Sequence, residues 1–229
     1  GGDATFNGSI KTHSQSSPST AQEFATRGSG NRASAYRDGK TLSKDKATDS
    51  TIPQKGKEKI VAHGPNGNIE QTYTISNYAD IGEACNQAFA DGAGRVSTPS
   101  DISKSHSTTI DISKNQQGQV LQVPKNTTLT YTGSDEAVRV HSDDSAVLGG
   151  EWEHDSGNFG GPGNAVGIRV ATTNNNTLGC EIKPTRLSDF HDGVLLESDS
   201  GYGIAYTVIG GPTRITFCTN AVTCRSTDS

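Results

Sequence analysis

The stretch Gly167-Ile168-Arg169-Val170 decides the fold, because it returns 26 residues later as Gly193-Val194-Leu195-Leu196. Between the two lies Thr177-Leu178-Gly179-Cys180-Glu181-Ile182, and Gly203-Ile204-Ala205-Tyr206 follows. Each run alternates apolar residues with others, as a strand that buries one face requires. One coil of such strands cannot bury its apolar face alone, so neighbouring coils must stack. The repeat therefore predicts an all-β fold, a right-handed parallel β-helix.

Short β-rich runs of this kind fill the chain from about Asp80 to Phe217, and Gly, Asn, Asp and Ser separate them. The other runs are Gln119–Val123, Thr128–Tyr131, Ala137–Val140, Ala146–Leu148, Leu178–Ile182, Val194–Leu196, Ile204–Val208 and Arg214–Phe217. An antiparallel sandwich is the alternative fold. In this region no Asn-Gly or Asp-Gly pair joins two alternating runs, as a tight hairpin would require.

One short helix is predicted near residues 81–90, before the first coil. Asp80 stands at the N-cap position, with Glu83 three residues later in the capping-box arrangement. Apolar residues then follow at helical spacing, namely Ile81, Ala84, Cys85, Ala88 and Phe89. Gly92 suits the left-handed position that ends a helix. We expect this helix to cap the end of the β-helix.

The first 79 residues differ from the rest in composition and charge. They are rich in Ser, Thr, Gly and Lys, and they carry ten Lys/Arg against seven Asp/Glu. Residues 80–229 carry ten Lys/Arg against eighteen Asp/Glu. A basic segment on an acidic body predicts two parts with different partners. We therefore expect an extended, mostly irregular arm over 1–79 and a β-helix domain over 80–229.

Sparse apolar and basic residues are the candidates for anchoring this arm to another protein. They are Phe6, Phe24, Tyr36, Lys55, Lys57 and Lys59. Such a segment can become ordered by lying along a partner, and a solvated polar arm is the alternative. No apolar run approaches the length of about 18 residues that a membrane helix needs. No aromatic residues interleave with the basic run from Lys40 to Lys59, and no recognition motif appears, which argues against a nucleic-acid partner.

The predicted helix Ile81–Phe89 and the segment Ala90–Pro99 after it resemble the opening of pectate-lyase-like β-helices, in which a short helix, a Gly-containing turn and a strand ending in Pro follow one another. Thr127–Gly133 and Val147–Trp152 resemble the second and third strands of that opening. Asp192-Gly193-Val194 resembles a rung of the same superfamily. The resemblance covers about 140 residues, and its motifs are structural rather than catalytic.

That superfamily contains polysaccharide lyases and hydrolases, and also spike and fibre proteins of tailed viruses, which are usually homotrimers. The polar arm resembles the particle-binding leader of the viral proteins. The resemblance thus implies a virion protein on the particle surface, either a tail spike, a fibre or a capsid decoration. It would bind other virion proteins through residues 1–79 and a host-surface glycan through the β-helix. The acidic, Lys-poor body further indicates a salt-rich habitat, as for a virus of haloarchaea.

A polysaccharide-degrading hydrolase or lyase on the same fold is the second hypothesis, and a purely structural capsid or baseplate protein is the third. Glycoside hydrolysis needs two carboxylates on one face. The candidates are Glu151, Glu153, Asp189 and Asp192. They depart from the polygalacturonase pattern, which has paired Asp residues, a Gly-His-Gly and an Arg-x-Lys, and the calcium-site Asp array of the lyases is not recognisable either. Solvated turns between rungs are the alternative, and the sequence favours a protein that is not an enzyme.

Aromatic and imidazole side chains near these acids are candidates for glycan binding. They are Trp152, His154 and His191, and Trp152 is also a candidate to fill the interior of a coil. The four cysteines match no zinc spacing, so no metal or other cofactor is predicted. Buried small side chains are the expected role of the cysteines, and a Cys218–Cys224 disulfide is the alternative.

Overall fold

The structure is a computed structural model that describes residues 35–37, 40–42, 58–64, 67–112, 117–157, 161, 163–172, 175–199, 201–211 and 213–226. The chain divides into two compact units, Gly1–Lys55 and Gly56–Ser229. In the first unit, β1 (Ala35–Arg37) pairs antiparallel with β2 (Lys40–Leu42). The second unit contains the predicted fold.

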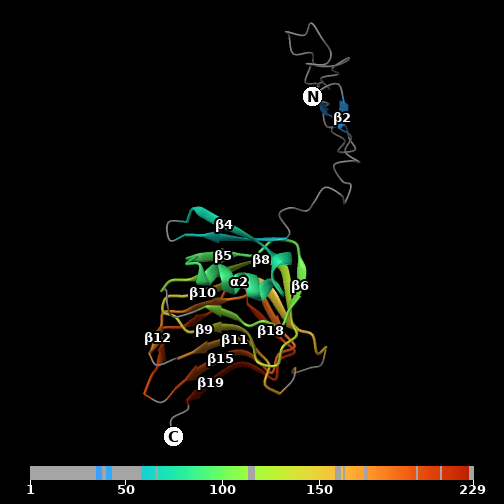
Figure 1. Cartoon of the computed structure of the whole chain (residues 1–229). Coiled ribbons are helices and arrows are strands. Elements are labelled where there is room, and N and C mark those ends of the chain that lie inside the picture. Colours follow the sequence, from blue (N-terminus) through green and yellow to red (C-terminus); the bar gives the residue numbers. More distant parts are fainter. Residues whose placement is uncertain are drawn as a thin grey trace, which may run out of the picture. The chain divides into compact units, whose positions relative to one another are not determined.

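The described residues of this second unit include a parallel β-solenoid of about four turns, so the predicted fold class is confirmed. Each coil places strands at three positions around the axis, and equivalent strands stack in parallel (Figure 1). The first position holds β5 (Arg95–Ser97), the start of β8 (Val120–Tyr131), the start of β10 (Ala146–His154), β13 (Glu181–Lys183) and β17 (Val208–Ile209). The second position holds β6 (Ser103–His106), the ends of β8 and β10, β14 (Arg186–Ser188) and β18 (Arg214–Thr216).

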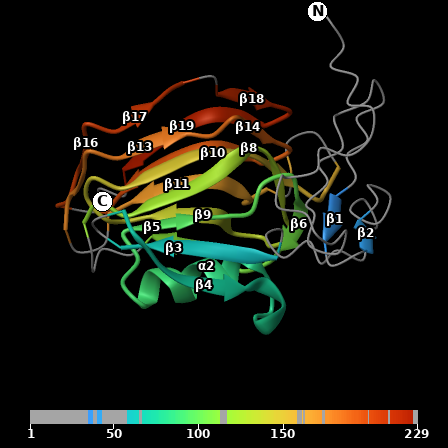
Figure 2. The same cartoon turned by 90° about the horizontal axis from the view of Figure 1, so that it is seen from above.

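The third position forms a separate five-stranded sheet that carries the site described below. It holds β7 (Ile110–Ile112), β9 (Glu136–Val140), β11 (Val166–Ala171), β15 (Asp192–Ser198) and β19 (Asn220–Ser226). The first two positions belong to a ten-stranded sheet. A short pair, β12 (Thr177–Leu178) and β16 (Ile204–Ala205), stacks at one corner. Viewed from above in Figure 2, β9 and β11 follow one another in the stack, and helix α2 (Ile81–Ala90) lies at one end of it.

Inward-facing apolar side chains stack from coil to coil and form the core. On the five-stranded sheet, Ile110, Val138, Ile168 and Val194 occupy matching positions, and all are fully buried. Because one residue per coil fills each level, the core is a thin column. This explains how a chain with only 30% hydrophobic residues folds without a two-layer core.

Two consecutive glycines let β10 turn from the first position to the second. Gly149 and Gly150 have φ angles of +73° and +74°, in the region that favours glycine. A Cβ at Gly149 would stand 2.1 Å from the carbonyl oxygen of Val123 on the neighbouring coil. The pairing of β10 with β8 shifts register between Gly149 and Glu151, so this bend separates two parallel segments of one strand.

The predicted helix is present as α2, with the predicted caps. The Asp80 side chain accepts a hydrogen bond of 2.9 Å from the backbone N–H of Glu83, and Glu83 accepts one from the N–H of Ala79. Gly92 follows the C-cap Asp91 with a φ of +96°. The apolar face of α2 is buried against the first coil, so the helix closes this end of the solenoid, as expected.

Two strands before α2 also belong to the solenoid unit, so this unit begins earlier than the expected boundary after residue 79. β3 (Lys59–His63) pairs antiparallel with β5 and with β4 (Ile69–Thr74). The Tyr73 hydroxyl donates a 2.8 Å hydrogen bond to Asp91 at the end of α2. The hairpin and α2 together cover the first coil (Figure 1).

Asp80 connects the helix to the first coil, so we expect Asp80→Ala to destabilise the protein by about 2 kcal/mol. Besides capping α2, its carboxylate accepts hydrogen bonds from the backbone N–H groups of Ser107 and Thr108. Burial alone would raise the pKa of Asp80, but the N–H donors of Glu83, Thr108 and Ser107 outweigh it and hold the pKa below its usual value. Asp80→Asn, which keeps one acceptor oxygen, should cost less.

The pH dependence of stability tests whether the negative charge of Asp80 contributes to the stabilisation. A lowered pKa in the folded state means that this stabilisation is present above the ordinary Asp pKa of about 3.9 and is lost as pH falls through the folded-state pKa. Urea unfolding at neutral and acid pH measures both effects. Equal stability of Asp80→Ala and the wild type at neutral pH would contradict the assigned role.

Candidate functional site

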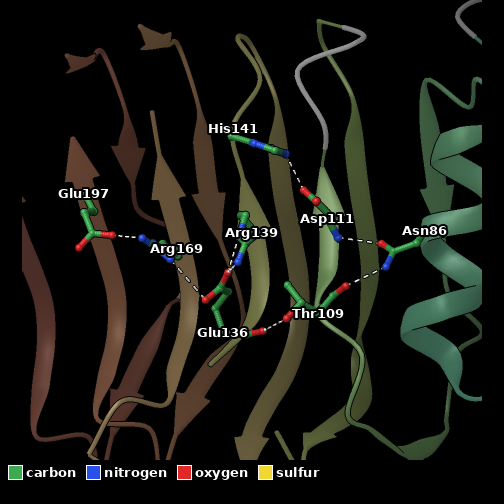
Figure 3. A network of polar contacts seen from close by, with 8 residues as sticks. All are labelled: Asn86, Thr109, Asp111, Glu136, Arg139, His141, Arg169 and Glu197. Atoms are coloured by element: carbon green, nitrogen blue, oxygen red, sulfur yellow. Dashed lines mark hydrogen bonds and ion pairs between the residues drawn. The ribbon is translucent and has the colours of Figure 1, made fainter. Parts of the chain in front are cut away.

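A network of polar side chains crosses the outer face of the five-stranded sheet, beginning at α2 (Figure 3). Asn86 of α2 donates from Nδ2 to the carbonyl oxygen of Thr109 at 2.8 Å, and its Oδ1 accepts from the N–H of Asp111 at 2.7 Å. Asp111 contacts His141, with 2.6 Å between Oδ1 and Nε2. These contacts attach the capping helix to the first two strands of the sheet.

Glu136 lies at the centre of this network and is buried, with 3% of its surface exposed. It forms ion pairs with Arg139 on its own strand and with Arg169 on the next, the latter at 3.6 Å. Arg169 also forms an ion pair with Glu197 one coil further on (Figure 3). Arg139 and Arg169 are direct neighbours in register, which alone would be repulsive. The shared carboxylate of Glu136 offsets that repulsion.

Asp192 forms a second buried carboxylate centre on the same sheet, with 1% of its surface exposed. Its Oδ1 accepts hydrogen bonds from Asn220 at 2.8 Å and from Thr223 at 2.5 Å, and its Oδ2 pairs with Arg225 at 3.0 Å. All three donors come from β19, one coil later. Charge-assisted bonds of this kind hold a buried carboxylate in a fixed orientation.

Both carboxylates line one cleft of about 250 Å³, which we call the carboxylate cleft. Its charged lining residues are Asp135, Glu136, Arg169, Asp192, Glu197 and Arg225, and Asn164 lies at its wall. The cleft is therefore polar, and rigid strands position most of these groups. A ligand that fits it must exchange hydrogen bonds with carboxylates, guanidinium groups and an amide.

A second polar cleft, of about 300 Å³, lies where the five-stranded sheet turns toward the first strand position. His141, Asp143, Asn176 and Leu178 are among its lining residues. Asp143 is already engaged, because its Oδ1 accepts from the N–H of Leu178 at 2.9 Å. Most polar atoms here hold the corner of the coil together, so we take the carboxylate cleft as the candidate site.

The four carboxylates proposed from sequence do not converge on one site. Only Asp192 lines the carboxylate cleft among these four. Glu151 and Glu153 lie on β10 in the other sheet, where Glu153 accepts a 2.9 Å hydrogen bond from Thr130 and Glu151 is 4.0 Å from Arg186. Asp189 lies in the turn after β14 with a φ of +66°. Period-two spacing along one strand groups acids of β10, whereas the carboxylate cleft draws its residues from successive coils.

Trp152 and His154 lie inside the coil, where they cannot stack on an external sugar. Trp152 is fully buried, and its Nε1 donates to the carbonyl oxygen of Gly149 at 3.1 Å. His154 is 5% exposed and bonds the Gly133 carbonyl oxygen through Nε2 at 2.8 Å. His191 is half-buried beside Asp192. The interior role weighed for Trp152 is therefore confirmed.

A ladder of rings runs along the interior at the second strand position. His106, Tyr131, His154 and Phe190 follow one another with centroid distances of 5.3, 6.0 and 5.9 Å. His106 is 1% exposed, and its Nδ1 lies 2.9 Å from the carbonyl oxygen of Thr108. Burial lowers the pKa of His106, although that carbonyl and the charge of Asp80 act in the opposite direction.

We therefore expect stability to fall as pH drops below about 6.5, the ordinary pKa of histidine. The unfolded chain binds a proton there while folded His106 does not, so the unfolded state gains stability until the lowered folded-state pKa is reached. His106→Phe should flatten this part of the pH profile, measured by urea unfolding between neutral pH and pH 5. An unchanged profile in this variant would contradict the assignment.

Most residues proposed to anchor the arm lie outside the described residues. These are Phe6, Phe24, Lys55 and Lys57. Tyr36 belongs to β1, where only the backbone is described. Lys59 opens β3, where it pairs with Thr74 and is half-buried. Anchoring by these residues stays a prediction.

The cysteines are free thiols, so the alternative Cys218–Cys224 disulfide is not formed in this structure. Cys85 and Cys180 are buried in the core, as expected, and burial raises the pKa of Cys180 to about 11. Within the described ranges, no group of three His, Cys, Asp or Glu residues is arranged to hold a metal ion. No helix in the described part of the chain is long and apolar enough to cross a membrane.

Sequence reasoning missed Glu136, Arg139, Arg169 and Arg225, although one signal for two of them was present. Ala137–Val140 and Gly167–Val170 carry an Arg at the same place in the run. Stacking these runs places Arg139 beside Arg169. Because two like charges at this distance repel, a carboxylate is expected nearby.

Comparison of the chain with protein-family models, curated proteins and solved structures finds no match in any of the three.

Proposed function

We propose that this protein binds a glycan in the carboxylate cleft and displays that cleft on a larger assembly. The observation that supports glycan binding is the pair of buried, Arg-held carboxylates, Glu136 and Asp192, in one open polar cleft. Sugar hydroxyls both donate and accept hydrogen bonds, so carboxylate, guanidinium and amide groups together complement them. Rigid strands keep these groups in place before a ligand arrives, which lowers the entropy cost of binding.

The assembly part of the proposal rests on the charge division and on the resemblance to viral spike proteins. Residues 1–79 carry a net charge of +3 and residues 80–229 a net charge of −8. We propose that the basic segment attaches the chain to a virus particle as a tail spike, fibre or capsid decoration, and that three copies associate. Light scattering of the full chain should give the mass of a trimer, and a monomer would contradict this part.

A polysaccharide hydrolase or lyase is the second candidate, because two carboxylates line one cleft as glycoside hydrolysis requires. The contacts of these carboxylates disfavour it. Both oxygens of Asp192 are held by donors from β19, and Glu136 is shared by two Arg residues. A catalytic acid or nucleophile needs an oxygen that faces the substrate. Binding without cleavage therefore fits the geometry better.

The test is binding of the full chain to a panel of host-surface glycans, repeated with a variant that fills the cleft. Asn164 is exposed at the cleft wall, so Asn164→Trp should weaken binding at least about tenfold, or 1.4 kcal/mol, without disturbing the buried ion pairs. Ser103→Trp, at an exposed site on the other sheet, is the matched control and should bind like the wild type. No glycan bound, or equal binding by Asn164→Trp, would contradict the proposal.

A further inference from the structure

The charges around the carboxylate cleft do not balance. Four carboxylates line it, from Asp135, Glu136, Asp192 and Glu197, against two guanidinium groups, from Arg169 and Arg225. Arg139 pairs with Glu136 but does not belong to the lining. The lining therefore carries a formal charge of −2, or −1 when Arg139 is counted with its partner Glu136, within a domain sequence whose net charge is −8. This excess bears directly on which ligand the cleft accepts.

Asp135 is the acid that carries the unpaired charge. Glu136, Glu197 and Asp192 each have an Arg partner within the network. Asp135 is exposed, and the described residues include no cation in an ion pair with it. It precedes the buried Glu136 directly, so its position at the rim is fixed by β9. The charged groups inside the cleft are already paired, whereas Asp135 at its rim is not. Asp135 is therefore placed to pair with a cationic group of a ligand.

We infer that the saccharide bound in the carboxylate cleft carries amino groups, with a protonated amine at Asp135 and hydroxyl groups at Arg169 and Asn164. This inference rests on the proposed glycan binding and names the class of glycan. Acidic saccharides are disfavoured, because like charges brought together at a binding site oppose association. The acidic domain around the cleft adds a longer-range attraction for cations that salt weakens.

A matched pair of probes isolates the amine. A short chitosan oligosaccharide and the chitin oligosaccharide of equal length share a backbone, but only the first carries free amines. An oligogalacturonate supplies the acidic comparison. With the full chain at low salt and at a pH that protonates the amine, calorimetry should show chitosan binding about fivefold tighter than chitin. The preference should shrink in high salt, and oligogalacturonate should bind most weakly.

Variants locate the preference within the cleft. Asp135→Asn should reduce the affinity for chitosan to that for chitin. Glu151→Gln removes the same charge from the outer face of the other sheet and should keep the chitosan preference. Chitin binding as tightly as chitosan, tighter binding of oligogalacturonate, or a full preference in Asp135→Asn would overturn the inference while leaving glycan binding intact. Binding of none of the three, with no other glycan retained, would overturn both proposals.

Discussion

Replacing Trp152 with Ala is expected to lower the free energy of unfolding by about 3–5 kcal/mol. The indole is fully buried and stacks between Leu129 and Leu187 of the coils on either side. It also meets the ring of His106 edge-on at a centroid distance of 6.3 Å. Because the core is one column, a cavity here weakens three consecutive coils, and few neighbours are available to fill it.

Urea unfolding followed by circular dichroism measures this loss. Trp152→Phe should lower the free energy of unfolding less than Trp152→Ala, because a ring still fills this part of the coil interior. Phe217→Ala is the control for an exposed aromatic residue, since 56% of Phe217 is exposed, and its cost should stay below about 1 kcal/mol. A Trp152→Ala protein with wild-type stability that had lost glycan binding would show instead that Trp152 is a sugar platform.

The second large effect is expected from Asp192→Ala, which should cost about 3 kcal/mol and weaken glycan binding. Removing this carboxylate leaves the side chains of Asn220, Thr223 and Arg225 without their shared acceptor. Those contacts fasten β19 to β15, so we expect the last coil to loosen first. Asp199→Ala, at an exposed site just after β15, should change stability by less than about 0.5 kcal/mol.

Hydrogen exchange separates the local effect from global unfolding. In Asp192→Ala, amides of β19 should exchange faster while those of β9, three coils from β19, keep their protection. Asp192→Asn retains an acceptor oxygen, so the protection of its β19 amides should lie between that in Asp192→Ala and that in the wild type. Equal protection of β19 in all three proteins would contradict the role assigned to Asp192.

The parts of the fold that depend on local patterns could be predicted from the sequence. The capping box at Asp80 and Glu83 defined α2 to within one residue of its end. The alternating runs located most rungs, because one buried face per strand leaves a clear period of two. The runs Gln119–Val123 and Thr128–Tyr131 proved to be one long strand, β8, since Pro124 and the residues after it continue the extended backbone between two sheet positions.

The parts that depend on register between coils could not be predicted. The coils differ in length. Arg139, Arg169 and Leu195 are in register on successive coils, but the first two are 30 residues apart and the last two are 26 apart. A single period therefore cannot align the outer faces. The cleft gathers residues from successive coils, so its carboxylates are neighbours in space and far apart in sequence.

The hairpin of β3 and β4 has a local sequence signal, an Asn-Gly pair. Asn66-Gly67 is a strong hairpin pair between β3 and β4, and Gly67 has a φ of +79°. Its flanking runs lie in a polar segment whose composition predicted an extended arm. Pairing with β5 and burial of Ile60 and Tyr73 against the core override that composition.

The claim that the carboxylate cleft binds a glycan is tested most directly by a crystal structure of the full chain with the saccharide retained from the binding panel. We predict a sugar ring in the cleft, with hydroxyl groups within about 3 Å of Arg169 and Asn164. A sugar bound to the outer face of the ten-stranded sheet beside Glu151 and Glu153, with the carboxylate cleft empty, would contradict the claim.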